Sequence, residues 1–343
     1  MATLPSKKSF RPKRLKDQVI VITGASSGIG LATARMAASR GARVVLAARN
    51  AQDLEAVTNE MCARGGRAVS VPADVSDAEA IEELGRRAVL EFGTIDTWVN
   101  NAGLSIYGKL TEVPLEDKRK LFDINFWGVV HGCRTAVRLM KDAGGVIVNV
   151  GSEVSEIAIP LQGIYSASKH AVKAYTDALR MELDHDDLPI AVTLVKPSAI
   201  NTPFPEHARN YMKEGVPALP PPVYAPELVA DVILRCAERP VRDVVVGGRG
   251  RVQIALGRAA PKLADKFMEA TMFDQQKAYD RSQPREGSLD RPQSDGRAYG
   301  PHKGHTMRSS VYTRTALSPV LRTLAFTAAG VVLAAGVRRI SLP

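Results

Sequence analysis

The chain has 343 residues and a formal net charge of +10, which suits one α/β domain of about 250 residues with extensions. Its three cysteines and six histidines are scattered and form neither a disulfide framework nor a metal-ligand spacing, so we expect a reducing, cytoplasmic compartment and no metal. Residues 1–16 carry six basic side chains and no acidic ones, and residues 281–343 carry ten basic and three acidic ones. The excess positive charge therefore belongs to two tails. Because neither tail resembles a nucleic-acid-binding module, we expect a small-molecule partner instead.

Beyond the basic tail of residues 1–16, apolar strand patterns alternate with helical patterns. Strands are predicted at residues 19–23, 44–48, 68–72, 97–99, 146–150, 190–195 and 244–246. Helices are predicted from residue 29 and at residues 51–63, 77–92, 115–140 and 165–183. This alternation predicts one Rossmann-type α/β domain over residues 17–250, a doubly wound parallel sheet of seven strands with helices on both faces.

A glycine-rich loop, GASSGIG, joins the first predicted strand to the first predicted helix. Its glycines Gly24, Gly28 and Gly30 allow a tight turn, and the following helix N-terminus attracts anionic phosphate. A plain strand-to-helix turn is the alternative interpretation. The position of the loop, directly after the first strand of the domain, favours a phosphate site.

A second candidate site lies at the start of the predicted helix 165–183. Tyr165 and Lys169 are four residues apart, so both can point from one helix face into the same site. A neighbouring cation lowers the pKa of a phenol toward the range in which it transfers protons efficiently. Ser152, at the end of the strand before, can donate a hydrogen bond to a substrate oxygen. Tyr-x-x-x-Lys also occurs by chance, so its context decides.

The motifs TGASSGIG at residues 23–30, NNAG at residues 100–103, Ser152, and Tyr165 with Lys169 resemble, in order and spacing, the short-chain dehydrogenase/reductase family. The resemblance covers about residues 17–250 and is closest to the single-domain branch. Asn125 falls where this family places a fourth catalytic residue.

The resemblance implies a nicotinamide-dependent oxidoreductase in which Tyr165 donates or accepts the proton while hydride passes between the cofactor and a carbonyl or alcohol carbon. It further implies that Lys169 holds the nicotinamide ribose and lowers the pKa of Tyr165. Ser152 would orient and polarise the carbonyl, and Asn125 would hold a water in a proton relay to Lys169.

Cofactor preference is predicted from the end of the second strand. Folds that prefer NAD usually place a carboxylate there, but this chain has Ala48 followed by Arg49, which suits a 2′-phosphate and predicts NADP(H) over NAD(H). An ordinary surface arginine is the alternative. Beside Arg49, the expected cofactor-binding residues are Gly24, Ser26, Ser27, Gly28, Ile29, Gly30, Asp74, Val75, Asn101, Ala102, Gly103, Tyr165, Lys169, Pro197, Ile200 and Thr202. Ser198 departs from the family pattern, which has glycine there.

A proline-rich segment, residues 204–224, occupies the position of the family's substrate lid and contains one predicted short helix at 208–213. After residue 250 the pattern ends. We predict a helical extension at residues 251–274, as one or two amphipathic helices, and a flexible linker of Gly, Ser, Arg, Gln and Asp at 275–316.

Residues 317–343 are predicted to form an apolar helix. Its uninterrupted apolar run, residues 324–337, has fourteen residues, whereas a membrane-spanning helix needs about 20. Extending the run back to Leu317 gives twenty-one residues but includes Pro319 and Arg322. The segment is therefore predicted either to associate with a membrane or to pack on the body or on a partner subunit.

The function that the sequence favours is an NADP(H)-dependent carbonyl reductase or alcohol dehydrogenase acting on a hydrophobic small molecule. A homo-oligomer is implied by the resemblance alone. The alternative is a catalytically silent dinucleotide-binding protein that acts as a redox sensor or scaffold, against which the complete set of Asn125, Ser152, Tyr165 and Lys169 argues. A lyase or epimerase on the same fold is disfavoured, because the chain lacks a large C-terminal substrate domain.

Overall fold

The computed structural model describes residues 10–279, 285–293 and 296–317. Its centre is a sheet of seven parallel strands in the order β11-β7-β6-β4-β1-β2-β3. The strands are β1 (Val19–Thr23), β2 (Arg43–Ala48), β3 (Arg67–Pro72), β4 (Thr97–Asn100), β6 (Gly145–Val150), β7 (Ile190–Pro197) and β11 (Asp243–Val246). This sheet confirms the predicted fold class.

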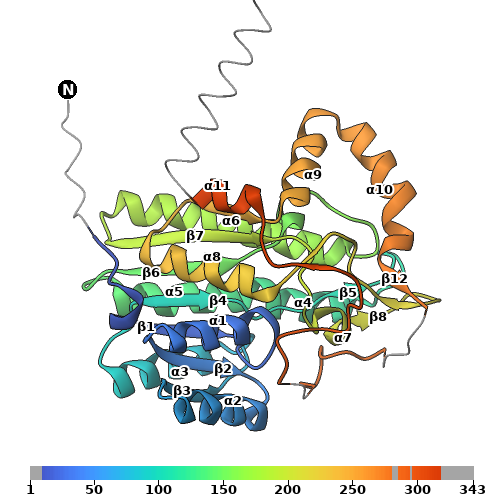
Figure 1. The fold of residues 1–343 in the computed structure, drawn as a ribbon. Helices are drawn as coiled ribbons and strands as arrows, with labels where there is room; N and C mark the ends of the chain where they lie inside the picture. The colour runs from blue at the N-terminus through green and yellow to red at the C-terminus, as the bar shows by residue number, and fades with distance from the viewer. Residues whose placement is uncertain (1–9, 280–284, 294–295, 318–343) are drawn as a thin grey trace, which may run out of the picture.

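Helices cover both faces of the sheet (Figure 1). One layer contains α1 (Gly28–Ser39), α2 (Ala51–Ala63) and α8 (Pro226–Glu238), and the other contains α3 (Ala78–Phe92), α4 (Leu115–Phe122), α5 (Gly128–Met140) and α6 (Gly163–His185). Side chains of a strand alternate between faces. In β1, Ile20 and Ile22 accordingly join one core, and Val19 and Val21 join the other. Both faces of the sheet are buried under helices, which explains why the strand sequences are continuously apolar.

The long helix predicted at residues 115–140 contains an irregularity. Between α4 and α5 the chain makes a π-helical segment, Asp123–Trp127, with Asn125 at its centre. The amide of Gly128 bonds back to the carbonyl of Asp123, five residues earlier. Single π turns inside α-helices occur frequently at functional sites, and this one turns Asn125 toward the sheet edge described below.

The strand order reverses direction between β1 and β4, so the loops after these two strands diverge to opposite faces. In open α/β sheets, ligands bind at the carboxyl ends of the strands beside such a reversal. The loops that follow β1, β4, β6 and β7 all leave the sheet at this edge and carry most of the predicted site residues.

The region predicted as a lid has short elements. Helix α7 (Phe204–His207) is followed by β8 (Arg209–Asn210), which pairs with β5 (Ile106–Tyr107). The helix predicted at 208–213 is therefore wrong. Proline near the start of α7 favours a helical turn there, and pairing with β5 holds the following residues extended. Farther along, β9 (Val216–Pro217) and β10 (Val223–Tyr224) complete the region.

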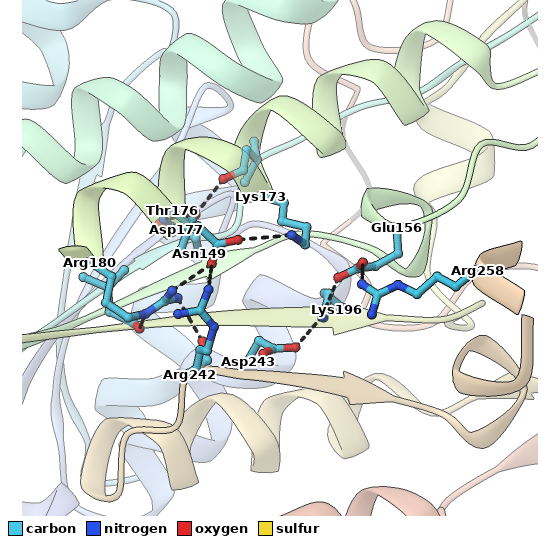
Figure 2. A network of polar contacts seen from close by, with 12 residues as sticks. Asn149, Glu156, Lys173, Thr176, Asp177, Arg180, Lys196, Arg242, Asp243 and Arg258 are labelled. Carbon is cyan, nitrogen blue, oxygen red and sulfur yellow. Dashed lines mark hydrogen bonds and ion pairs between the residues drawn. The ribbon is translucent and has the colours of Figure 1, made fainter. Parts of the chain in front are cut away.

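Two helices follow the sheet, α9 (Gly248–Ala259) and α10 (Pro261–Gln275), separated at Ala260, which precedes a proline and is not helical (φ −144°, ψ 68°). Figure 1 shows them as a helical hairpin projecting from the body. Helix α9 is tied back by Arg258, which donates to Glu156 of the loop after β6 (Figure 2). Glu156 also pairs at 2.9 Å with Lys196 of β7, and both side chains are at least nine-tenths buried.

Residues 285–293 and 296–317 pack along the body instead of forming the predicted flexible linker. Before them, β12 (Lys277–Ala278) pairs with β9. Within them, β13 (Thr306–Met307) pairs with β10, and α11 (Val311–Leu317), labelled in Figure 1, lies next to β11. Composition predicts a linker because apolar residues are few, but these residues bond to the body mainly through backbone atoms.

The apolar helix predicted at 317–343 lies outside the described residues from 318 onward. Among the helices that the structure describes, none combines the length and apolar character needed to span a bilayer.

Candidate active site

Three of the predicted catalytic side chains meet at the carboxyl end of β6. Tyr165 and Lys169 extend from the first turns of α6, and Ser152 begins the short helical turn after β6. All three residues are buried, with 8%, 3% and 9% of their surface exposed. The Ser152 side chain is close enough to the Tyr165 phenol to lower its pKa, and its oxygen accepts from the amide of Val154 at 3.3 Å. The Lys169 ammonium donates to the carbonyl of Val150 at 2.9 Å and lies 5.9 Å from the centroid of the Tyr165 ring.

Burial has the largest effect on the pKa values of Tyr165 and Lys169. Burial raises the pKa of Tyr165 to about 12; the side chain of Ser152 opposes this rise, and the charge of Glu153 adds to it. Burial also lowers the pKa of Lys169 to about 8. The prediction that Lys169 lowers the pKa of Tyr165 below its ordinary value is therefore wrong for the cofactor-free protein. The phenol of Tyr165 and the ammonium of Lys169 are both desolvated by burial, and the ammonium bonds to a carbonyl oxygen instead of the phenol.

The side chain of Asn125 is fully buried and is used to hold the loop after β4. Its Oδ1 accepts from the amide of Leu104 at 2.8 Å, and its Nδ2 donates to the carbonyl of Leu104 at 2.9 Å and to Ser168 at 3.1 Å. A side chain added at Gly103 would lie 3.3 Å from Asn125 Oδ1 and 3.5 Å from Lys169 Nζ. The side-chain amide of Asn125 therefore positions the loop after β4 next to Lys169, and its role in holding a water stays a prediction.

Buried amides also lock the strand that carries Ser152 to the helix that carries Tyr165. Asn149 of β6 donates to Thr176 of α6 at 2.9 Å (Figure 2), and Asn100 of β4 donates to Asn149 at 2.9 Å. Buried polar groups of this kind stabilise a single arrangement when all of them are bonded. Because they lie one layer below the site, they fix the spacing between Ser152 and Tyr165.

A single cavity runs from the glycine-rich loop to the catalytic side chains. Besides Ser152, Tyr165 and Lys169, the predicted cofactor-binding residues that line it are Gly24, Ser26, Ser27, Gly28, Ile29, Arg49, Asp74, Val75, Asn101, Ala102, Gly103, Pro197, Ile200 and Thr202. Gly30 does not line it. A Cβ there would lie 2.1 Å from the carbonyl oxygen of Gly24, so Gly30 serves the close packing of the loop on α1.

The walls of the phosphate end are held by Thr23 and Asn101. The Thr23 hydroxyl accepts from the amides of Asn101 and Ala102 at 3.0 and 3.2 Å, and the Asn101 side chain donates to the carbonyls of Thr23 and Gly24 at 2.9 and 3.2 Å. Gly24 has φ +66°, a left-handed conformation that favours glycine. The motif predicted Asn101 as a cofactor contact, whereas the role of Thr23 could be recognised only from the fold.

Arg49 lies at the other end of the cavity, at the end of β2. Its guanidinium donates to the backbone carbonyls of Ser288 and Leu289, the latter at 3.3 Å, and lies 4.0 Å from Asp74. Ser288 also lines the cavity, together with Pro292 and Gln293. No sequence pattern predicts these three residues as part of the site, because no spacing rule relates Arg49 to a residue 239 positions away.

The end of the cavity beyond Tyr165 is mostly apolar. The side chains there are Leu104, Tyr107, Val154, Ile159, Phe204, Leu219 and Pro220, with Glu153, Gln162 and His207 as polar members. The rings of Phe204 and Tyr165 lie 5.5 Å apart between centroids. A few polar groups among apolar ones are typical of sites for small organic molecules.

The residues fit a dinucleotide by their own geometry. Ser27 precedes α1 without a side-chain cap bond within the described chain. The amide of Gly28 donates to the carbonyl of Arg297 at 2.9 Å, so it is the later amides of the first turn, those of Ile29 and Gly30, that remain to bind an anion. Gly24 and Gly28, both left-handed, bring the backbone close to the cavity. The cavity then ends, at its opposite side, on a phenol and an ammonium. A phosphate-binding loop and a proton-transfer pair within one cavity are what a nicotinamide dinucleotide requires.

Comparison with known proteins agrees with this geometry. Residues 18–213 match the family model for short chain dehydrogenase. The chain is 41% identical over 336 residues to an uncharacterized oxidoreductase, YxnA, of Bacillus subtilis, covering 97% of this chain and 94% of that protein.

Two solved structures are also similar. A short chain dehydrogenase/reductase from Burkholderia phymatum in complex with NAD has a TM-score of 0.65 and 28% identity, covering 72% of this chain and 94% of that one. An alcohol dehydrogenase from the archaeon Thermococcus sibiricus, complexed with 5-hydroxy-NADP, has a TM-score of 0.59 and 29% identity, covering 66% and 95%. The chain therefore belongs to the short-chain dehydrogenase/reductase family, as an enzyme that acts on CH–OH or C=O groups with a nicotinamide dinucleotide.

Proposed function

We propose that the protein is an NADP(H)-dependent oxidoreductase that interconverts a hydrophobic carbonyl compound and its alcohol, with Tyr165 as the proton donor or acceptor. The observation that carries the proposal is that Ser152, Tyr165 and Lys169 line the same cavity as the glycine-rich loop. The bound cofactor supplies or accepts the hydride.

The proton chemistry follows from burial. A phenol with a pKa of about 12 keeps its proton at neutral pH, so Tyr165 is ready to donate to a substrate oxygen in the reductive direction. Ser152 lines the cavity beside Tyr165, and its hydroxyl can donate to the same substrate oxygen. Lys169 has a pKa of about 8 and so remains mostly protonated at neutral pH. Its ammonium favours the negative charge that develops on the phenol as the proton leaves.

Arg49 supports the phosphorylated cofactor. It lies at the cavity end nearest α2, and Ala48 stands where a carboxylate would bind a ribose 2′-hydroxyl. The two related structures were solved with NAD in one case and an NADP derivative in the other. The preference of this chain therefore rests on Arg49.

A hydrophobic substrate is supported by the apolar end of the cavity around Tyr107, Val154 and Phe204. We also propose a homo-oligomer, because the apolar side chains Leu115 of α4, Trp127 and Met181 of α6 are 61%, 48% and 63% exposed. Membrane contact through residues 318–343 stays a prediction. It fails if the full-length protein remains in the soluble fraction without detergent.

The test is to follow nicotinamide absorbance with NADPH and with NADH across a panel of hydrophobic ketones, aldehydes and alcohols. We expect turnover that prefers NADPH and is abolished in Tyr165→Phe. Tight cofactor binding with no turnover on any substrate would instead favour the silent sensor or scaffold. Turnover retained by Tyr165→Phe would contradict the assigned proton donor.

A further inference from the structure

Residues 285–293 lie across the end of the cavity that contains Arg49; we call them the adenosine strap. The amide of Ser288 donates to the carbonyl of His207 at 2.7 Å, and the carbonyl of Arg285 accepts from the amide of Asn210 at 2.8 Å. Leu289 is 4% exposed and packs in one of the two main cores. Backbone bonds and a buried leucine thus hold the strap in one place.

Ion pairs fix the outer side of the strap. The carboxylate of Asp290 pairs with Lys120 of α4 at 2.6 Å and with Arg209 of β8. Arg209 is itself held by the buried Asp117 at 2.8 Å. The carboxylate of Asp290 is therefore directed toward α4 and β8 and is compensated there.

The inner side of the strap faces the cavity and holds Arg49. Two of the five guanidinium N–H groups go to the carbonyls of Ser288 and Leu289. Carbonyl oxygens carry no net charge, so these bonds orient the guanidinium without neutralising it. Its remaining N–H groups keep their capacity to bind an anion in the cavity, and Asp74, at 4.0 Å, is the nearest carboxylate to the guanidinium among the described residues.

Ser288 adds an unusual feature at the same place. Its residue is 4% exposed, it lines the cavity with Arg49, and its hydroxyl has no hydrogen-bond partner among the described residues. A buried hydroxyl without a partner costs free energy, and such groups are rare in folded proteins. The hydroxyl oxygen is itself buried in the cofactor-free protein, and rotation about the Cα–Cβ bond would turn it into the cavity that the residue lines, where a ligand oxygen would satisfy it.

We propose that the adenosine strap is part of the cofactor site and that Ser288 donates its hydroxyl to the ribose 2′-phosphate beside Arg49, which the strap holds in place. This inference rests on the proposed NADP(H) preference and adds a residue far outside the residues 18–213 that match the family model. The phosphate would receive charge-assisted bonds from a guanidinium and a hydroxyl, an arrangement suited to its several acceptor oxygens.

The experiment measures dissociation constants of NADP⁺ and NAD⁺ for the full chain by calorimetry, in wild type and in Ser288→Ala. Ser309→Ala is the matched control, since it makes the same change at an exposed position of the same C-terminal region. For Ser288→Ala we expect NADP⁺ to bind about tenfold more weakly, the size of one hydrogen bond to a charged group, and NAD⁺ to bind within about twofold of wild type. Ser309→Ala should change neither constant.

Asp290→Asn provides a second variant, because it loosens the outer anchors of the strap without touching the cavity. It should weaken NADP⁺ binding about threefold. An NADP⁺ constant unchanged within twofold in Ser288→Ala, while Arg49→Ala still weakens NADP⁺, would overturn the role of the strap and leave the proposed function intact. A wild type that binds NADP⁺ no better than NAD⁺ would overturn both. Thermal unfolding without nucleotide identifies any variant that has lost its fold.

Discussion

The two ends of the cavity are built in different ways. At one end, Ser152, Tyr165 and Lys169 lie within eighteen residues of sequence, and each is placed by the strand or helix that carries it. At the other end, Arg49 is held by carbonyls of the adenosine strap, 239 residues away. The proposed proton-transfer group thus depends on local register, whereas the proposed recognition of the nucleotide depends on contact between distant segments.

The ends also differ in electrostatics. The side chains of the catalytic end are buried, and burial has the largest effect on the pKa values of Tyr165 and Lys169. The strap end is held by charged pairs, such as Lys120 with Asp290, whose side chains are 51% and 43% exposed. Salt screens exposed pairs much more than buried groups. Nucleotide affinity should therefore respond to changes that leave the catalytic group intact, and the converse should also hold.

Tyr165→Phe should have the largest effect. Removing the hydroxyl removes the proton donor, and general acid–base catalysis is worth about 10²–10⁴-fold, so we expect turnover to fall by about a thousandfold or more. The dissociation constant of NADP⁺ should stay within about threefold, because the strap end is unchanged. Steady-state kinetics and calorimetry on the same preparation measure both. A comparable loss of nucleotide affinity would contradict the separation of the two ends.

Glu156→Gln tests the buried support behind the catalytic end. Burial opposes ionisation of Glu156, but its bonds to Lys196 and Arg258 outweigh burial and lower its pKa. The change leaves the buried Lys196 with Asp243 as its carboxylate partner, and we expect the free energy of unfolding to fall by about 1.5–3 kcal/mol in denaturant titrations, the contribution of a hydrogen bond to a charged group.

Glu60→Gln is the control for Glu156→Gln. Glu60 pairs with Arg35 and Arg64 on the surface of α1 and α2, with its side chain 29% exposed. Surface pairs contribute about 0–1 kcal/mol, so its loss should be smaller than that of the buried pair. Equal losses would mean that the ion pair of Glu156 and Lys196 has no special structural role.

Arg49→Ala should affect the strap end selectively. We expect the dissociation constant of NADP⁺ to rise about 10- to 100-fold, since charge-assisted hydrogen bonds contribute about 1.5–3 kcal/mol. The constant for NAD⁺ should change little, and turnover at saturating cofactor should remain near that of wild type. Competition between the two nucleotides in one titration measures the ratio directly. A parallel loss for NAD⁺ would show that Arg49 supports the fold of the site rather than reading the phosphate.

Lys169 predicts a pH dependence of stability in the cofactor-free protein. Its pKa is lowered from 10.5 to about 8 in the folded state, so between these values the unfolded chain binds more protons and stability rises with pH. Relative to Lys169→Met, the wild type should gain about 1–2 kcal/mol between pH ~8 and ~9.5. Using this difference removes the contributions of Cys133 and Cys236, whose pKa values burial raises to about 12. A pH-independent difference would contradict the buried ammonium.

The sequence predicts the order and type of the sheet elements well, because each strand is buried on both faces and each motif lies directly at a strand end. It also predicts which residues line the cavity, with Gly30 and Asn125 as exceptions that serve packing and positioning. Glycine and asparagine are residue types that can contact a ligand. Only the fold shows that Gly30 and the side chain of Asn125 already contact neighbouring backbone atoms.

Two predictions failed because they depend on tertiary contacts. Polar composition at residues 275–316 predicts a flexible linker, yet Leu289 is buried and the backbone of Ser288 bonds to both His207 and Arg49. The predicted pKa shift of Tyr165 failed for a similar reason. The spacing places Lys169 on the same helix face as the phenol, but it does not reveal that burial is the largest influence on the pKa of Tyr165.

The most direct test of the two-ended site is phosphorus NMR of NADP⁺ bound to the full chain, followed against pH. A free phosphate monoester takes up a proton near pH ~6. Contacts from Arg49 and the Ser288 hydroxyl favour the dianion, so the account predicts that the bound 2′-phosphate stays doubly charged below pH ~5 and that Ser288→Ala moves its pKa partly back. A bound 2′-phosphate that titrates like the free nucleotide would contradict recognition at the adenosine strap.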